Sequence, residues 1–175
     1  MATATQAPPI SKEFALAFRQ MMVEGLKGEM ATTRKVIEAI PEAKKDYRPD
    51  PKARTAFDLA WHIAVVEVQF AEEIAEGAFA MQERYKNECK SVKELAEWYG
   101  KNFPRALEKI QKMTPDQLTK VLDFYGAFQF PAVMYLQFIA KHSVHHRGQL
   151  STYLRPMGSK IPSIYGGSAD EPWKG

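Results

Sequence analysis

The amino-acid sequence predicts an all-helical protein built as a four-helix bundle. Apolar residues recur at the three- and four-residue spacing of helices in four long stretches, and no stretch shows convincing strand alternation. Capping residues, prolines or a glycine mark the ends of these stretches. Four such helices joined by connections of modest length are typical of a bundle. We therefore expect a disordered N-terminal tail, residues 1–10, and one helical bundle domain, residues 11–175.

The first two helices have clear borders in the sequence. The first is expected over residues 11–40, and Pro41 ends it. Its apolar residues include Phe14, Phe18, Met21, Met22 and Met30. After a linker rich in proline and charge, the second helix is expected over residues 55–80. Thr55 is a good N-cap for it, with Asp58 at the third helical position.

The last two helices are bordered just as clearly. The third is expected over residues 91–113, because Ser91 and Glu94 have the spacing of a capping box. The fourth is expected over residues 131–157, and Gly158 is a natural residue to end it.

The connections carry weaker signals. Residues 114–117 read as a short helical turn with proline at its first position. Residues 121–130 are aromatic and ambiguous, and an extended stretch packed on the bundle is one interpretation. The tail after residue 158 has few residues that form a core.

Composition excludes several classes of protein. The 24 basic and 21 acidic residues give a net charge of +3, which is too even to indicate nucleic acid or a membrane as a partner. The longest uncharged run, residues 124–140, is interrupted and falls short of a membrane span. The N-terminus lacks the features of a signal peptide. A single cysteine, Cys89, allows no intrachain disulfide, so we expect a soluble cytoplasmic protein.

Three of the four histidines lie close together in the fourth predicted helix, in the stretch KHSVHHRGQL. A helix turns by about 100° per residue, so His146 lies only about 40° from His142 and one turn further along. Both project from the apolar face, whereas His145 lies at its flank. His62 has the same placement on the second helix. Its face is shared by the apolar residues Leu59, Val66 and Phe70.

These placements predict a divalent-metal site made by His62, His142 and His146. Two imidazoles at positions i and i+4 are a standard way for one helix to bind an ion. Burying imidazoles without partners costs free energy, and a shared ion would satisfy all three. Three protein ligands leave positions for water or substrate, as in catalytic sites. The alternative is three hydrogen-bonded core histidines without an ion. His145 is expected at an interface or beside a ligand.

Neighbouring residues are candidates for supporting roles. Gln149 lies within about 20° of His142 around the helix axis, and Gln69 has a similar angle to His62. Both could reach the site as hydrogen-bonding groups, and Tyr153 is expected to pack there. Arg147 lies far round the helix and is expected at the surface or an interface. Gly148 costs about 1 kcal/mol relative to alanine inside a helix, so we expect a close approach of two helices there.

Several motifs together resemble the DinB/YfiT-like superfamily of metal-dependent proteins. The most specific is the H-x-x-H-H-R-G-Q block at residues 142–149. The others are Tyr47-Arg48-Pro49-Asp50, Ala60-Trp61-His62-Ile63-Ala64, Tyr153-Leu154-Arg155 and Pro162-Ser163-Ile164-Tyr165-Gly166. The resemblance spans nearly the whole chain.

The resemblance implies further properties. The superfamily's fold is an up-down-down-up four-helix bundle that is usually dimeric, so a homodimer is expected. Its metal ligands match His62, His142 and His146, with nickel or zinc as the usual ion. Characterised relatives include transferases and isomerases that use low-molecular-weight thiols, and many members have no known activity.

The expected function is accordingly that of a metal-dependent enzyme acting on a small molecule, either a small-thiol-dependent S-transferase or an isomerase. A metal-dependent hydrolase is one alternative. A non-catalytic metal- or ligand-binding stress-response module is another, and a purely structural dimeric bundle is a third. The catalytic residues and the thiol-binding residues are left open by the sequence.

Overall fold

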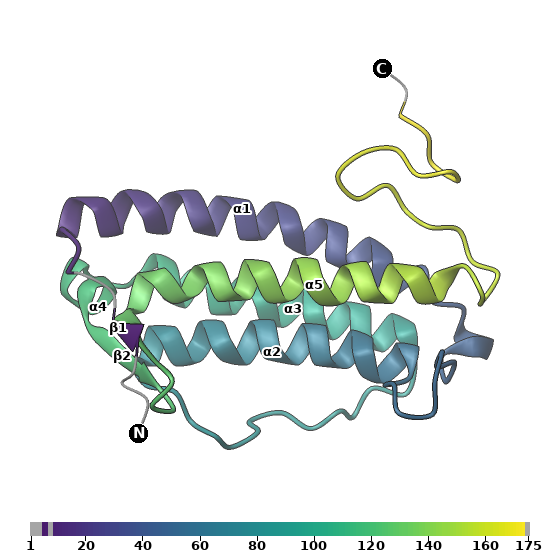
Figure 1. The fold of residues 1–175 in the computed structure, drawn as a ribbon, viewed down its shortest axis with the longest axis horizontal. Helices are drawn as coiled ribbons and strands as arrows, with labels where there is room; N and C mark the ends of the chain where they lie inside the picture. Colours follow the sequence, from purple (N-terminus) through teal and green to yellow (C-terminus); the bar gives the residue numbers. More distant parts are fainter. Residues whose placement is uncertain (1–4, 7–8, 174–175) are drawn as a thin grey trace.

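The structure is a computed structural model that describes residues 5–6 and 9–173. Four long helices lie side by side along its long axis (Figure 1). They are α1 (Lys12–Glu38), α2 (Ala56–Glu76), α3 (Val92–Gln111) and α5 (Leu136–Leu154). The protein is therefore mostly helical, whereas the sequence predicted an all-helical fold. No helix in the described ranges combines the length and the hydrophobicity that crossing a membrane requires.

The predicted capping residues begin the helices. Thr55 Oγ1 accepts a hydrogen bond from the Asp58 amide at 3.0 Å, and Ser91 Oγ accepts one from the Glu94 amide at 3.2 Å. Helix α2 ends earlier than predicted because Gly77 adopts a φ of 79°, the left-handed conformation that commonly terminates helices.

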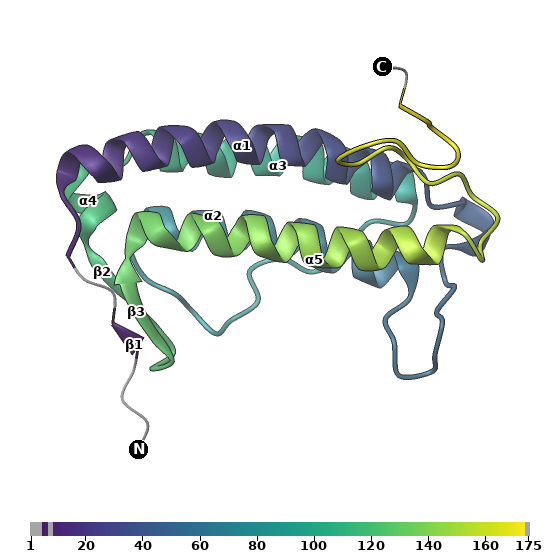
Figure 2. The same ribbon diagram turned by 45° about the horizontal axis from the view of Figure 1, so that its top comes forward.

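The structure contains a small sheet in addition to the predicted helices. The segment between the short helix α4 (Pro115–Thr119) and α5 forms a hairpin of β2 (Val121–Phe124) and β3 (Phe128–Pro131). The short strand β1 (Thr5–Gln6) pairs in parallel with β3, which gives the strand order β1-β3-β2. A 3-10 turn, Ala132–Tyr135, leads from the hairpin into α5. The sheet lies at the end of the molecule where α5 begins (Figure 2).

The predicted N-terminal tail is described only in part. Residues 1–4 and 7–8 lie outside the described residues, and Thr5–Gln6 form strand β1. The division of the chain into a tail and one domain stays a prediction.

The core fills the space between the four long helices. The closest packing joins α2 to α3 and α5, and α1 to the same two helices. Its largest fully buried apolar side chains include Leu26, Ile37, Ile63, Tyr99, Phe103 and Leu107. Because α5 is covered by α1 on one side and by α2 on another, side chains on two of its faces are enclosed. One of these faces carries the histidines.

Candidate metal centre

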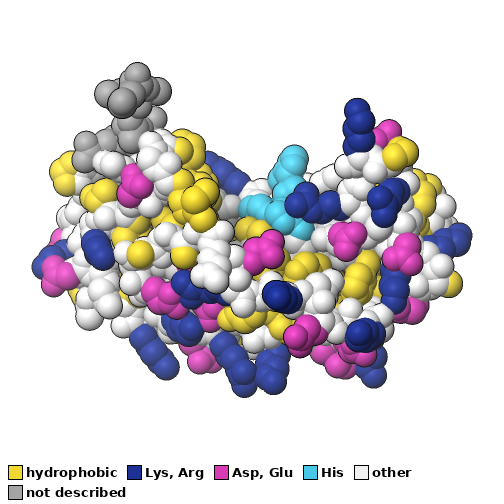
Figure 3. Space-filling view, turned by 90° about the horizontal axis from the view of Figure 1, so that it is seen from below, with side chains coloured by type: hydrophobic (Ala, Val, Ile, Leu, Met, Phe, Trp, Pro, Cys, Tyr) yellow, Lys and Arg dark blue, Asp and Glu magenta, His cyan; other side chains and the backbone are white. Residues whose placement is uncertain are grey.

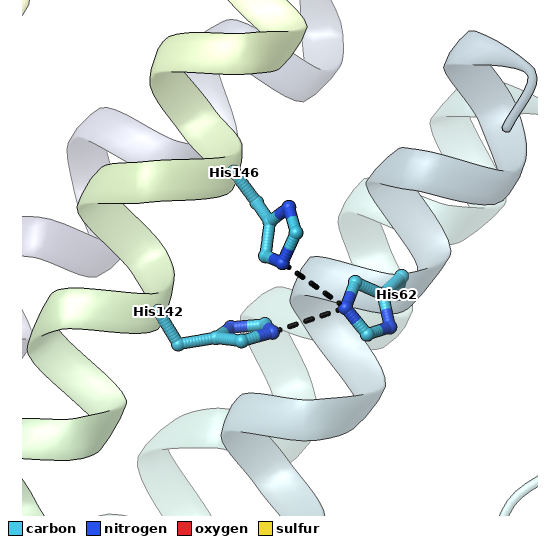
Figure 4. Close-up of side chains that lie close together, drawn as sticks. All are labelled: His62, His142 and His146. Carbon is cyan, nitrogen blue, oxygen red and sulfur yellow. Dashed lines mark hydrogen bonds between the residues drawn. The ribbon is translucent and has the colours of Figure 1, made fainter. Parts of the chain in front are cut away.

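His62, His142 and His146 meet between α2 and α5, with their rings pointing toward one another (Figure 4). Nε2 of His62 lies 3.1 Å from Nε2 of His142 and 3.3 Å from Nε2 of His146. Residues 142 and 146 are one turn apart on α5, and the packing of α2 on α5 brings the third ring to them. The three side chains form a cluster that could hold a divalent metal ion.

Two of the three separations between these nitrogen atoms fit a single ion. Ligands at about 2.0–2.1 Å from a tetrahedral zinc ion lie about 3.3 Å from one another. The 3.1 Å and 3.3 Å separations of His62 Nε2 from the other two Nε2 atoms are close to this value. His146 Nδ1 lies 3.0 Å from the acceptor Gln149 Oε1, so Nδ1 carries the proton and Nε2 turns its lone pair to the cluster. The buried Nδ1 of His142 has no hydrogen-bond partner among the described residues.

Electrostatics keep the cluster uncharged near neutral pH. Burial is the largest cause that lowers the pKa of His62 to about 4 and that of His142 to about 3. The next cause is Arg54 for His62 and repulsion between the neighbouring rings, when they are protonated, for His142. Burial also lowers the pKa of His146, although its hydrogen bond to Gln149 opposes the shift. Arg54 contributes to the lowering at all three rings. Neutral imidazoles have the free lone pair that metal binding needs.

The predicted supporting residues divide into two groups. Gln149 reaches the site, since it contacts His146 and donates from Nε2 to the Tyr153 hydroxyl at 3.3 Å. Gln69 does not support the histidines, because it donates to Glu73 at 2.9 Å and to a loop carbonyl at 3.1 Å. His145 contacts His146 edge to face, with ring centroids 4.6 Å apart, and stays outside the cluster.

Two expectations about α5 were wrong. Arg147 is only 1 % exposed, and its guanidinium pairs with Glu29 of α1. It also donates to Thr33 Oγ1 at 3.0 Å. The expected surface position failed because α1 covers the face of α5 that lies away from the histidines. A Cβ atom at Gly148 would meet no atom within 4 Å, so close helix packing does not explain that glycine.

A cleft of about 510 Å³ opens beside the histidines, which Figure 3 shows gathered in a hollow with hydrophobic, basic and acidic side chains around them. His62, His142 and Arg54 line the cleft together. Its apolar wall comprises Trp61, Val65, Val66, Phe70, Phe124, Phe138 and Ile139. This cleft was not predicted, because α2, the hairpin and α5 form it jointly. The place of Arg54 in the cleft was not predicted either, since its only signal in the sequence is its position just before the N-cap of α2.

The Gln149→Ala variant is expected to weaken divalent metal binding by roughly 10–100-fold, because residues that orient a ligand histidine have effects of this size. Without the amide, the His146 ring loses the bond that fixes its protonation and its orientation. Metal titration by calorimetry measures the change. Thr152→Ala is the matched control, because Thr152 is exposed on the same helix and bonds only a backbone carbonyl. Equal affinities in the two variants would contradict the role of Gln149.

The fold and the cluster define a class of protein, namely mostly helical proteins with a three-histidine site that could hold a divalent ion. The sequence model of the DinB family matches residues 14–174, and this chain belongs to the DinB family.

Similar proteins agree with this assignment. The chain is 30 % identical over 129 residues to YjoA of Bacillus subtilis, described as an uncharacterised protein, covering 72 % of this chain and 82 % of YjoA. The crystal structure of YjoA has a TM-score of 0.70 at 24 % identity, covering 82 % of this chain and 97 % of that one. A DinB-like protein from Bacillus cereus also has a TM-score of 0.70 at 24 % identity, covering 82 % and 95 %. These structures share the fold.

Proposed function

We propose that this protein is a metal-dependent enzyme that binds a divalent ion through His62, His142 and His146. The observation that carries the proposal is that three ring nitrogen atoms converge beside a cleft large enough for a small molecule. Three protein ligands leave coordination positions for a reactant, whereas structural zinc sites have four. No fourth histidine, cysteine or carboxylate joins the cluster among the described residues.

Nickel or zinc is the ion we propose, because imidazole ligands suit both metals. When bound, such an ion acts as a Lewis acid and lowers the pKa of a thiol or water that it contacts. The chain's own residues prepare the site. Gln149 fixes the ring of His146, Arg54 contributes positive charge, and the apolar wall of the cleft keeps water from a bound reactant.

The reaction we propose is transfer or isomerisation that uses a small thiol. In the transfer, the thiol sulfur forms a bond to an electrophilic carbon, the leaving group departs with its electron pair, and the thiol proton is released to solvent. The apolar cleft would hold the electrophile beside the histidines.

A screen of low-molecular-weight thiols with monochlorobimane tests this reaction. With zinc or nickel bound, at least one thiol is expected to form its fluorescent thioether about tenfold or more faster than without protein, with chloride as the leaving group. Addition of a chelator should return the rate to background. A metal-loaded protein that gives no rate above background would argue against thiol transfer and favour a hydrolase or a binding module.

We further propose that the helices form an up-down-down-up bundle and that the protein is a homodimer. The loop between α2 and α3, residues 77–91, runs back along the molecule, which supports a common starting end for those two helices (Figure 1). Exposed apolar side chains on α1 and α5 are available to a second copy, namely Phe14, Met21 and Val144. A monomeric mass in solution scattering would contradict the dimer.

A further inference from the structure

We propose that the cleft beside the histidines takes a small organic anion with an elongated apolar or aromatic body, its charged head at the histidine end. This inference rests on the proposed function, because it names the class of ligand that the same site accepts. Three features of the cleft carry it: its apolar wall, its length and the distribution of its charges.

The wall of the cleft is apolar and well packed. Helix α2 contributes Trp61, Val65 and Val66, and α5 contributes Phe138 and Ile139. At the end near the hairpin, Phe70 packs against Phe124 with ring centroids 5.6 Å apart. Such a wall gains free energy by covering a hydrocarbon or aromatic surface, because both surfaces then leave water.

The cleft is long enough for an extended molecule. His62 and Glu73 both line it, and these residues stand eleven positions apart on α2. At about 1.5 Å per residue, that separation is about 16 Å along the helix axis. The histidine end and the hairpin end are therefore distinct places, and a ligand with two different ends would bind in one orientation.

At the histidine end of the cleft lies a positive charge, that of Arg54, which has no ion-pair partner among the described residues. Arg54 is exposed, lines the cleft with His62 and His142, and makes no ion pair among the residues that the structure describes. A guanidinium without a carboxylate partner is suited to an oxyanion such as a carboxylate.

None of the three acidic side chains that line the cleft forms an ion pair with Arg54. Glu73 lies toward the other end and accepts a hydrogen bond from Gln69 at 2.9 Å. Glu67 is buried in the wall, where burial raises its pKa to about 7 and the Tyr99 hydroxyl donates to it. Glu83 is exposed in the loop that follows α2, where its chain neighbours Gln82 and Arg84 both hydrogen-bond Gln69.

Binding of three probes to the full chain tests the inference. The probes are 4-phenylbutanoate, butanoate, which lacks the ring, and 4-phenylbutan-1-ol, which lacks the charge. Calorimetry gives the affinities, and the tryptophan fluorescence, to which Trp61 in the cleft contributes, provides a second signal. We expect 4-phenylbutanoate to bind at least about tenfold more tightly than either of the others. Equal affinity for the acid and the alcohol, or for the two acids, would overturn the inference.

Two variants assign the binding to the two parts of the cleft. Arg54→Gln should remove the preference for acid over alcohol, whereas Arg48→Gln, exposed on the same linker and outside the cleft, should retain it. Val66→Gln should weaken both phenyl probes, whereas Val144→Gln, at an exposed position on α5, should not. The same results from a variant and its control would overturn the inference.

Metal-free and zinc-loaded protein are measured in parallel, with metal content determined for each. Selective binding of 4-phenylbutanoate to protein that takes up neither zinc nor nickel would support the ligand class while rejecting the proposed enzyme. Full zinc content without that selectivity would support the metal site and reject the ligand class. The two failures are therefore distinguishable.

Discussion

A double variant, His142→Ala/His146→Ala, is expected to lose more than about 100-fold in divalent metal affinity. Residues that only orient a ligand histidine are worth roughly 10–100-fold, and this variant removes two of the three ligands themselves. The remaining ring, His62, offers one nitrogen atom and cannot chelate an ion. The purified variant should therefore contain almost no metal, whereas the unmodified protein should contain about one ion per chain.

Elemental analysis of both proteins, followed by calorimetric titration with zinc, measures this loss. His145→Ala is the matched control, because His145 neighbours His146 on α5 and stays outside the cluster. Its metal content should equal that of the unmodified protein. If the double variant contains as much metal as the unmodified protein, the assigned site is wrong.

Thermal unfolding gives a second measure of the same site. A ligand that binds only the folded state stabilises it, by about 2.7 kcal/mol at a free concentration 100 times the dissociation constant. A chelator should therefore lower the melting temperature of the unmodified protein and leave that of the double variant unchanged. A metal-free protein whose melting temperature is insensitive to chelator would instead favour a core of histidines without an ion.

The histidine cluster was predictable because it depends mainly on local geometry. In any α-helix, residues 142 and 146 lie on one face, whatever packs against it. The apolar neighbours of His62 placed it on the core side of its own helix in the same way. Helix angles alone could not predict that α2 packs against α5, which is the contact that brings the three Nε2 atoms together.

Features that depend on which elements meet were not predictable. Strand β1 pairs with residues more than a hundred positions away, for example Thr5 with Phe128. The cleft needs α2, the hairpin and α5 at once. The sequence correctly placed Arg147 on a different side of its helix from the histidines. The surface position was inferred on the assumption that α5 has a single buried face. In the fold, α1 covers the opposite face as well.

The Arg147→Met variant is expected to lower the free energy of unfolding by about 3 kcal/mol. Removing one partner of a buried ion pair typically costs about 3–5 kcal/mol, because the other charge stays behind without a partner. We expect the lower end of this energy range because the Glu29 side chain is 25 % exposed and water can partly solvate it. The variant also loses the hydrogen bonds to Thr33 and to the Glu29 carbonyl, and the guanidinium contact with Tyr165 of the tail. Urea denaturation measures the change.

Arg155→Met provides the matched control for this variant. Arg155 pairs with Asp170 at 2.7 Å, but its side chain is 52 % exposed, so its loss should cost less than about 1 kcal/mol. If Arg147→Met costs no more than Arg155→Met, the buried pair does not hold α1 and α5 together. Adding Glu29→Gln to Arg147→Met should recover part of the stability, since it removes the carboxylate left without its partner. Metal content is measured for each variant, because Arg147 neighbours His146 and only full metal content assigns the loss to the helix pair.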